Sequence, residues 1–161
     1  MLPPETGRMI LDSATGEPEG KSPHIADAIT ELHTRTVDAL RGYEKMVEKA
    51  EPEFRATAQK FRDLHDSHAS ALSRILIAMG AQVDADGSFM GTVNQAVVSL
   101  RAFFDEIDED VMDNIRSGED HVLKAFDGAL ASGAMPQDHE TSLLAMREEL
   151  LALLAATRHL D

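Results

Sequence analysis

The chain contains no cysteine and no tryptophan, and aromatic residues make up only 4% of its 161 residues. Without cysteine, the protein has no disulfide framework, no thiolate zinc site and no thiol nucleophile. The shortage of aromatic residues disfavours sheets, because aromatic and β-branched side chains are the ones enriched in strands. Alanine and leucine are abundant in the second half of the chain, which favours an all-α protein.

Basic residues are also scarce. Fifteen lysines and arginines stand against 29 aspartates and glutamates, which gives a formal net charge of −14. No basic cluster is available to displace counterions from a nucleic-acid backbone, and anionic membrane surfaces are disfavoured for the same reason. No apolar run reaches the length of a signal peptide or a membrane span. We therefore expect a cytoplasmic protein that binds neither nucleic acid nor membrane.

The length of the chain and the distribution of its prolines and glycines predict one domain behind a loose segment. Residues 1–21 contain three prolines and three glycines with little periodicity, a composition typical of a flexible leader. A chain of this length can bury one core but not two ordinary ones. Residues 22–161 are therefore expected to form a single helical domain.

Apolar periodicity predicts four long helices, over residues 23–50, 52–80, 109–132 and 136–160, and a further helix over 88–105. Ser22 is the expected N-cap of the first helix. Pro52 suits the first turn of a new helix, so the first two helices should form a tight antiparallel hairpin. Gly80 is the expected end of the second helix.

A break is expected between residues 88 and 132, because one helix over this range would be more than about 60 Å long. We place it near Asp108, and Ser117-Gly118 is the competing position. The last helix has apolar residues on most of its sides, which predicts a broad buried face.

Two histidines occupy the apolar stripe of the second helix. The stripe recurs at steps of three and four through Phe54, Ala58, Phe61, His65, His68, Leu72, Ile75 and Met79. Both imidazoles are therefore predicted to face the core, where they need partners. Those partners can be carboxylates together with a metal, or hydroxyl and carbonyl groups alone.

A glutamate on the third long helix is a candidate partner for these histidines. Glu119 lies four residues after Ile115 and three before Val122, which places it on or beside the buried stripe. A buried carboxyl group requires a cation, a proton or a metal. On the first helix, Tyr43 can bury its ring while its hydroxyl bonds to a carboxylate or a histidine.

These residues support two hypotheses. The first is a site for iron, manganese or zinc, with His65, His68, Glu119 and Glu44 as ligands. The second is a structural polar cluster without metal, to which Asp38, Tyr43 and Asp120 contribute. We favour the second, because two histidines without a ligand-dense motif are a weak metal signal. Replacing both histidines with leucine should then change stability by no more than ~2 kcal/mol, provided that the partner carboxylate can reach water.

Signatures of catalysis are missing from the sequence. It has no nucleophile elbow, no glycine-rich phosphate loop and no pair of histidines at the spacing of a zinc protease. A non-enzymatic protein that forms a homo-oligomer or binds a protein partner is therefore the leading hypothesis. A metal-binding or redox protein with a non-standard site is the alternative.

Residues 116–130 carry the most specific pattern in the chain: a basic residue, then Gly-Glu-Asp, then an aromatic residue before Ala-Leu. Together with Asp38 and Gly42-Tyr43, this pattern resembles a bacterial family of ferritin-like helical-bundle proteins that carry a domain of unknown function. The likeness extends from Ile25 to Leu160. Phe126 stands at a position where the family usually has tyrosine.

The resemblance implies a ferritin-like antiparallel four-helix bundle, with a crossover over residues 81–107 between the second and third main helices. Metal-bearing members of the wider superfamily use a Glu-x-x-His pair on each of two helices. The chain has no Glu-x-x-His anywhere, so a standard di-iron site is not expected.

Overall fold

The computed structural model describes residues 21–83, 89 and 111–160. These residues form the long helices α1 (Lys21–Lys49), α2 (Pro52–Ala78), α4 (Val111–Ala131) and α5 (Gln137–Ala156), followed by the short 3-10 helix η2 (Arg158–Leu160). Extended pairing within the described ranges is limited to one isolated bridge between Val83 and Phe89. The all-α prediction and its four long helices are confirmed, with boundaries within four residues. The helix expected over 88–105 lies outside the described residues.

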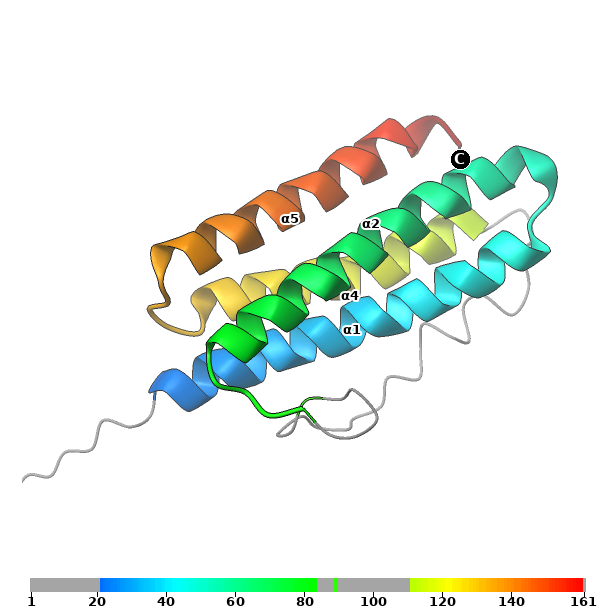
Figure 1. Ribbon diagram of the computed structural model, residues 1–161. Coiled ribbons are helices and arrows are strands. Elements are labelled where there is room, and N and C mark those ends of the chain that lie inside the picture. The colour runs from blue at the N-terminus through cyan, green and yellow to red at the C-terminus, as the bar shows by residue number, and fades with distance from the viewer. Residues whose placement is uncertain (1–20, 84–88, 90–110, 161) are drawn as a thin grey trace, which may run out of the picture.

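The four helices pack as two antiparallel hairpins. α1 packs against both α2 and α4, and α5 packs against α2 and α4. Figure 1 shows that each helix runs antiparallel to the two beside it, whereas α2 and α4 run in the same direction. The C-terminal end of α2 and the N-terminal end of α4 therefore lie at opposite ends of the bundle.

Local signals set the helix ends largely as the sequence predicts. Glu51 is extended, with φ −63° and ψ 153°, and Pro52 opens α2 directly after it. Gly80 has a φ of +87°, and the N–H of Ala81 donates to the carbonyl of Leu76 at 3.0 Å. This pairing closes α2 in the manner typical of a left-handed glycine stop. At its N-terminus, α1 begins at Lys21, so Ser22 lies inside the first turn and is not its cap.

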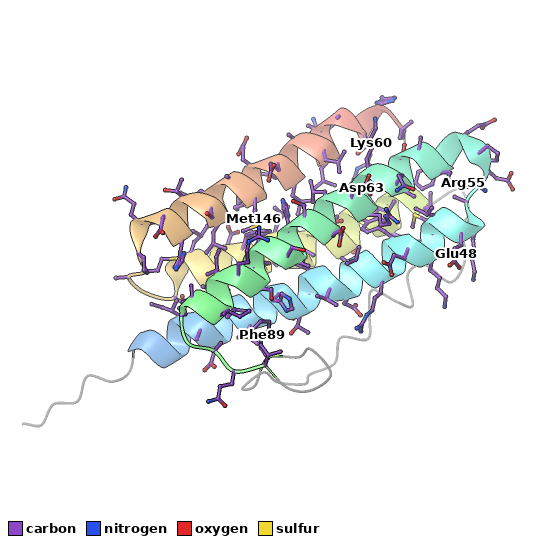
Figure 2. The ribbon with its side chains drawn as sticks, viewed as in Figure 1. Glu48, Arg55, Lys60, Asp63, Phe89 and Met146 are labelled. Carbon is purple, nitrogen blue, oxygen red and sulfur yellow. The ribbon has the colours of Figure 1, made fainter. Side chains whose placement is uncertain are left out.

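α4 passes without interruption through Ser117 and Gly118, so the competing break at that position is wrong. The break predicted near Asp108 lies outside the described residues. Phe89, the one described residue between 83 and 111, is buried with its ring edge-on to His33 of α1, at a centroid distance of 5.0 Å (Figure 2).

The core is filled mainly by α1, α2 and α4. Its largest fully buried side chains are Tyr43, Phe61, Phe126, Ile29, Leu32, Met46, Leu72, Leu76, Ile115, Leu143 and Leu150. Charged side chains such as Lys60 and Asp63 stand on the outside of the bundle (Figure 2).

The prediction of a broad buried face on the last helix is wrong. α5 buries only Leu143, Met146 and Leu150, and Leu144 is 50% exposed. The reason is geometric, since a helix at the corner of a four-helix bundle turns only part of its circumference toward the core. The remaining leucines of α5 lie along its flanks.

Candidate functional site

Three side chains from three helices meet inside the bundle. The hydroxyl of Tyr43 on α1 donates to Oε1 of Glu119 on α4 at 2.5 Å. Nε2 of His65 on α2 lies 2.8 Å from the same carboxyl oxygen. All three side chains are at most 1% exposed. We call Tyr43, His65 and Glu119 the buried cluster.

The helical register brings these groups together. Glu119 lies on the buried stripe of α4 with Ile115 and Val122, as the sequence predicts. The ring of Tyr43 stacks between two rings of α2, with centroids 5.1 Å from Phe61 and 5.5 Å from His65. Apolar packing therefore fixes the rings, and the polar atoms meet at the carboxyl group of Glu119.

His68 forms a separate pair nearer the surface. Its Nε2 lies 3.0 Å from Oε1 of Glu149 on α5, and Glu149 is 63% exposed. The imidazole itself is buried, edge-on to Phe126 at a centroid distance of 6.1 Å and to His65 at 6.4 Å. One histidine is therefore enclosed with its carboxyl partner, whereas the other has a partner that reaches solvent.

Burial shifts two of these groups in opposite directions. The pKa of Tyr43 is raised well above 10.0 by desolvation, and the charge of Glu119 and the hydrogen bond to it act in the same direction. The pKa of His68 is lowered below 6.5, because desolvation outweighs the favourable contacts with Glu149. At neutral pH, Tyr43 therefore keeps its proton, and neutral His68 donates its Nε2–H to Glu149.

Three buried polar atoms of this region have no hydrogen-bond partner among the described residues: Nδ1 of His65, Nδ1 of His68 and Oε2 of Glu119. Imidazole nitrogen and carboxylate oxygen are common metal ligands. However, the described part of the chain holds no group of three or more His, Cys, Asp or Glu side chains arranged to bind a metal ion. The geometry resembles a hydrogen-bonded core cluster more closely than a metal centre.

The other predicted site residues lie elsewhere. Glu44 is exposed on α1, one residue from Tyr43, so the structure does not bring it to the histidines. Asp120 is on the surface and pairs with Lys124 at 2.9 Å, which corrects its assignment to the polar cluster. Asp38 is half-buried on α1, on a different side of the helix from Tyr43.

Sequence reasoning missed Glu149 as a partner of His68. Its only signal is its place between Met146 and Leu150, the two buried residues that mark the inner stripe of α5. A glutamate at the flank of an apolar stripe is common on any surface helix, so the pairing required the packing of α2 against α5.

Residues 24–132 match the family described as Domain of unknown function (DUF2383), which is more than half of the chain. The chain belongs to this family. The DUF2383 match includes all three members of the buried cluster but ends before α5, and therefore before Glu149. The likeness predicted out to Leu160 is thus shown only to residue 132. No curated protein and no solved structure matches the chain.

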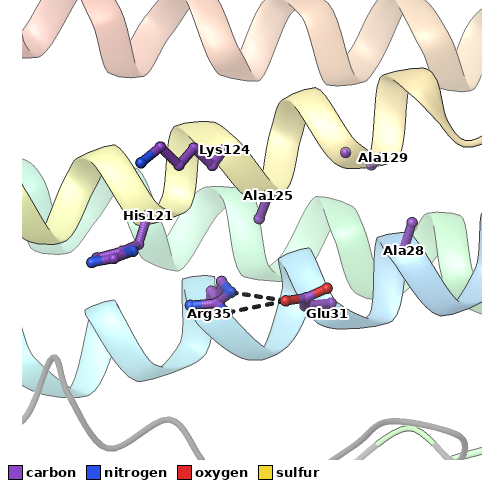
Figure 3. Close-up of a pocket in the computed structure, with 8 residues that line it drawn as sticks. Ala28, Glu31, Arg35, His121, Lys124, Ala125 and Ala129 are labelled. Atoms are coloured by element: carbon purple, nitrogen blue, oxygen red, sulfur yellow. Dashed lines mark hydrogen bonds and ion pairs between the residues drawn. The ribbon is translucent and has the colours of Figure 1, made fainter. Parts of the chain in front are cut away.

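A cleft of about 410 Å³ lies between α1 and α4 of the DUF2383 domain (Figure 3). Four small residues and four polar side chains line it: Ala28, Ala125, Gly128 and Ala129, with Glu31, Arg35, His121 and Lys124. Arg35 is paired with Glu31 at 3.0 Å and Lys124 with Asp120 at 2.9 Å. Both the arginine and the lysine at the cleft are therefore already paired with acidic neighbours.

None of the helices in the described ranges contains a stretch that is both long and apolar enough to cross a membrane.

Proposed function

We propose that this protein is a non-enzymatic, ferritin-like helical-bundle protein of the cytoplasm that self-associates. The observation that carries the proposal is the apolar surface of α5. Leu144 is half exposed, and Leu151, seven residues later on the same side of the helix, is partly buried. Apolar side chains grouped on an exposed helix face typically mark a surface for another protein.

The helix directions support the ferritin-like assignment. Because α2 and α4 are parallel, the end of α2 and the start of α4 lie at opposite ends of the bundle, about 40 Å apart for a helix of 27 residues. A long connection between the second and third main helices is the feature that separates ferritin-like bundles from simple up-and-down bundles.

The enclosure of the buried cluster supports a structural role for its polar groups. Substrates cannot contact Tyr43, His65 or Glu119, because each is at most 1% exposed. The hydrogen bonds that Tyr43 and His65 make with Oε1 of Glu119 favour the helix faces that meet here, since another pairing would bury these bonded atoms without partners. We therefore assign the cluster to the fold and the side of α5 that carries the exposed Leu144 to the function.

Sedimentation velocity of the untagged protein over a wide concentration range tests this proposal. The monomer has a mass of 17.6 kDa, and we expect the weight-average mass to approach at least twice that value as concentration rises. A constant monomer mass up to about 100 μM, well above the micromolar affinities of weak specific complexes, would contradict self-association.

A second candidate, metal binding, rests on the three buried atoms of His65, His68 and Glu119 that lack hydrogen-bond partners. Two imidazoles and a carboxyl group could recruit iron, manganese or zinc if the side chains rearranged. Elemental analysis of protein purified without a histidine tag distinguishes the candidates. Stoichiometric metal that is lost in His65→Leu would favour this function, and its absence from protein grown with all three metals would exclude it.

A further inference from the structure

α5 is held to the rest of the bundle by a small buried surface. Of its 20 residues, only Leu143, Met146 and Leu150 are buried, whereas α2 and α4 bury eight residues each. α5 lies at one side of the bundle, where it packs against α2 and α4 (Figure 1). Burial of apolar side chains is the main force that docks one helix on another, so α5 is held less firmly than the two helices beneath it.

The side-chain contacts of α5 lie at its edges, where water competes for them. Oε1 of Glu149 contacts Nε2 of His68 at 3.0 Å, but the side chain of Glu149 is 63% exposed. Arg147 pairs with Asp127 of α4 at 2.8 Å, and these two side chains are 30% and 57% exposed. Polar pairs this open to solvent contribute little to stability. They orient α5 on the bundle but add little to its buried contacts.

The connection between α4 and α5 is suited to act as a hinge. α4 ends at Ala131 and α5 begins at Gln137. Between them, Gly133 has a φ of +147°, a conformation that other residues rarely adopt. The DUF2383 match also ends here, at residue 132, and includes no residue of α5. Both observations separate α5 from the packing of α1, α2 and α4.

α5 covers one of the two histidines of α2. Nε2 of His68 points toward α5, because its partner Glu149 lies there, and the side chain of His68 is 3% exposed. His65 instead contacts Glu119 of α4 and stacks on Tyr43 of α1. Removal of α5 would therefore expose His68 and leave His65 enclosed by the other three helices.

We propose that α5 is a lid over His68, which opens as a unit about the loop at Gly133 while α1, α2 and α4 stay packed. In the closed form, solutes cannot reach the imidazole. In the open form its Nε2 is released from Glu149, and its Nδ1, which has no hydrogen-bond partner among the described residues, can reach water. The lid does not depend on the proposed self-association, because the closed and open forms are states of one chain.

Modification of the full chain by diethyl pyrocarbonate, located by mass spectrometry, tests the lid. This reagent carbethoxylates accessible imidazoles. We expect His68 to react about 100-fold faster than His65, because opening of α5 exposes the first and only unfolding of the remaining helices exposes the second. The protein is kept dilute, so that association does not contribute. Equal rates would show that α5 opens only when the whole bundle unfolds, and would overturn the proposal.

Three substitutions are matched to this measurement. Leu143→Ala removes a side chain that α5 buries and should speed modification of His68 by roughly 30-fold. Leu144→Ala changes the neighbouring residue, which is 50% exposed, and should change that rate by less than about threefold. Leu32→Ala removes a side chain buried on α1 and should speed modification of His65 but not of His68. Equal acceleration of both histidines by Leu32→Ala would overturn the lid. The wild-type comparison stands even where a variant fails to fold.

Amide hydrogen exchange distinguishes a lid from fraying at the end of a helix. We expect the amides between Leu143 and Leu150 to share one level of protection, below that of α2 and α4 and only weakly dependent on urea, because little surface is exposed when one helix opens. Protection that falls steadily from Leu143 toward Ala156 would show fraying and overturn opening as a unit. Protection of α5 equal to that of α2 would overturn the lid altogether.

Discussion

The two histidines of α2 are both buried, but the carboxyl groups with which they pair differ in their exposure to solvent. Replacing His65 with leucine leaves Glu119 enclosed, with Tyr43 as its remaining hydrogen-bond donor. Replacing His68 leaves Glu149, which is 63% exposed and can turn to water. We expect His65→Leu to lower the free energy of unfolding by roughly 3–5 kcal/mol and His68→Leu by about 1 kcal/mol.

Urea denaturation of the two single variants at pH 7 measures this difference. Equal losses would show that enclosure of the carboxyl partner is not what decides the effect. The bound of about 2 kcal/mol for replacing both histidines assumed that the partner carboxylate could reach water. That condition is met for Glu149 and not for Glu119, so we expect the double variant to exceed the bound.

The raised pKa of Tyr43 predicts that the fold loses stability in alkali. The unfolded chain releases the phenol proton near pH 10.0, whereas the folded chain retains it to higher pH. Stability is therefore fully present below pH 10 and is lost as the pH rises above it. Tyr43 is the only tyrosine, and tryptophan is absent, so tyrosinate absorbance reports this residue alone. It should appear together with the loss of helical circular dichroism.

Two observations check this prediction. Tyr43→Phe should be less stable at neutral pH by about 1–3 kcal/mol, because Glu119 loses a hydrogen-bond donor, yet its stability should fall less steeply in alkali. Tyrosinate absorbance that rises near pH 10 while the helical signal stays intact would contradict the enclosure of the hydroxyl.

The lowered pKa of His68 has the opposite consequence, in acid. The unfolded chain takes up a proton near pH 6.5, and the folded chain does so only at lower pH. The contribution of His68 to stability is therefore fully present above pH 6.5 and is lost as the pH falls through the folded pKa. His68→Gln should flatten the dependence of the urea midpoint on pH between about 7.5 and 5.5.

Burial lowers the pKa of His33 as well, so replacing His33 should also flatten this dependence on pH. A slope unchanged in both single variants would show that neither histidine is held neutral by the fold.

At the scale of the helical elements, two glycines predict opposite effects of the same substitution. Gly80 ends α2 at a φ of +87°, where a side chain is strained whatever the space. Gly128 lies inside α4, and a Cβ there would meet no atom within 4 Å. Gly80→Ala should destabilise the protein by about 1 kcal/mol, and Gly128→Ala should stabilise it by about 0.5–1 kcal/mol.

Thermal unfolding of the two variants measures both effects. A loss of stability in Gly128→Ala would mean that the added Cβ meets neighbouring atoms in solution. The cleft between α1 and α4 would then be narrower at Gly128 than in this structure.

At the scale of the whole molecule, a net charge of −14 on 161 residues predicts self-repulsion in the folded state. Raising the salt from about 0.01 M to about 0.15 M shortens the screening length from roughly 30 Å to roughly 8 Å. We expect the midpoint of urea denaturation to rise accordingly. A fall in the midpoint would contradict the prediction.

The sequence by itself determined the elements of this protein. Apolar residues spaced three and four apart predicted which side of each helix faces the core. Pro52 and Gly80 predicted the two ends of α2, because each restricts or extends the backbone conformations available there. The same periodicity predicted that His65, His68 and Glu119 are buried. These properties depend on residues close together in the chain, so they can be predicted without knowledge of the packing.

Only the tertiary structure decided which side chains meet. Whether Tyr43 or Glu44 joins the histidines depends on the rotation of α1 against α2 and α4, and one residue step changes the angle by 100°. The pairing of His68 with Glu149, and the exposure of Leu144, depend on where α5 lies at the corner of the bundle. Such contacts join residues far apart in sequence, and no local pattern encodes them.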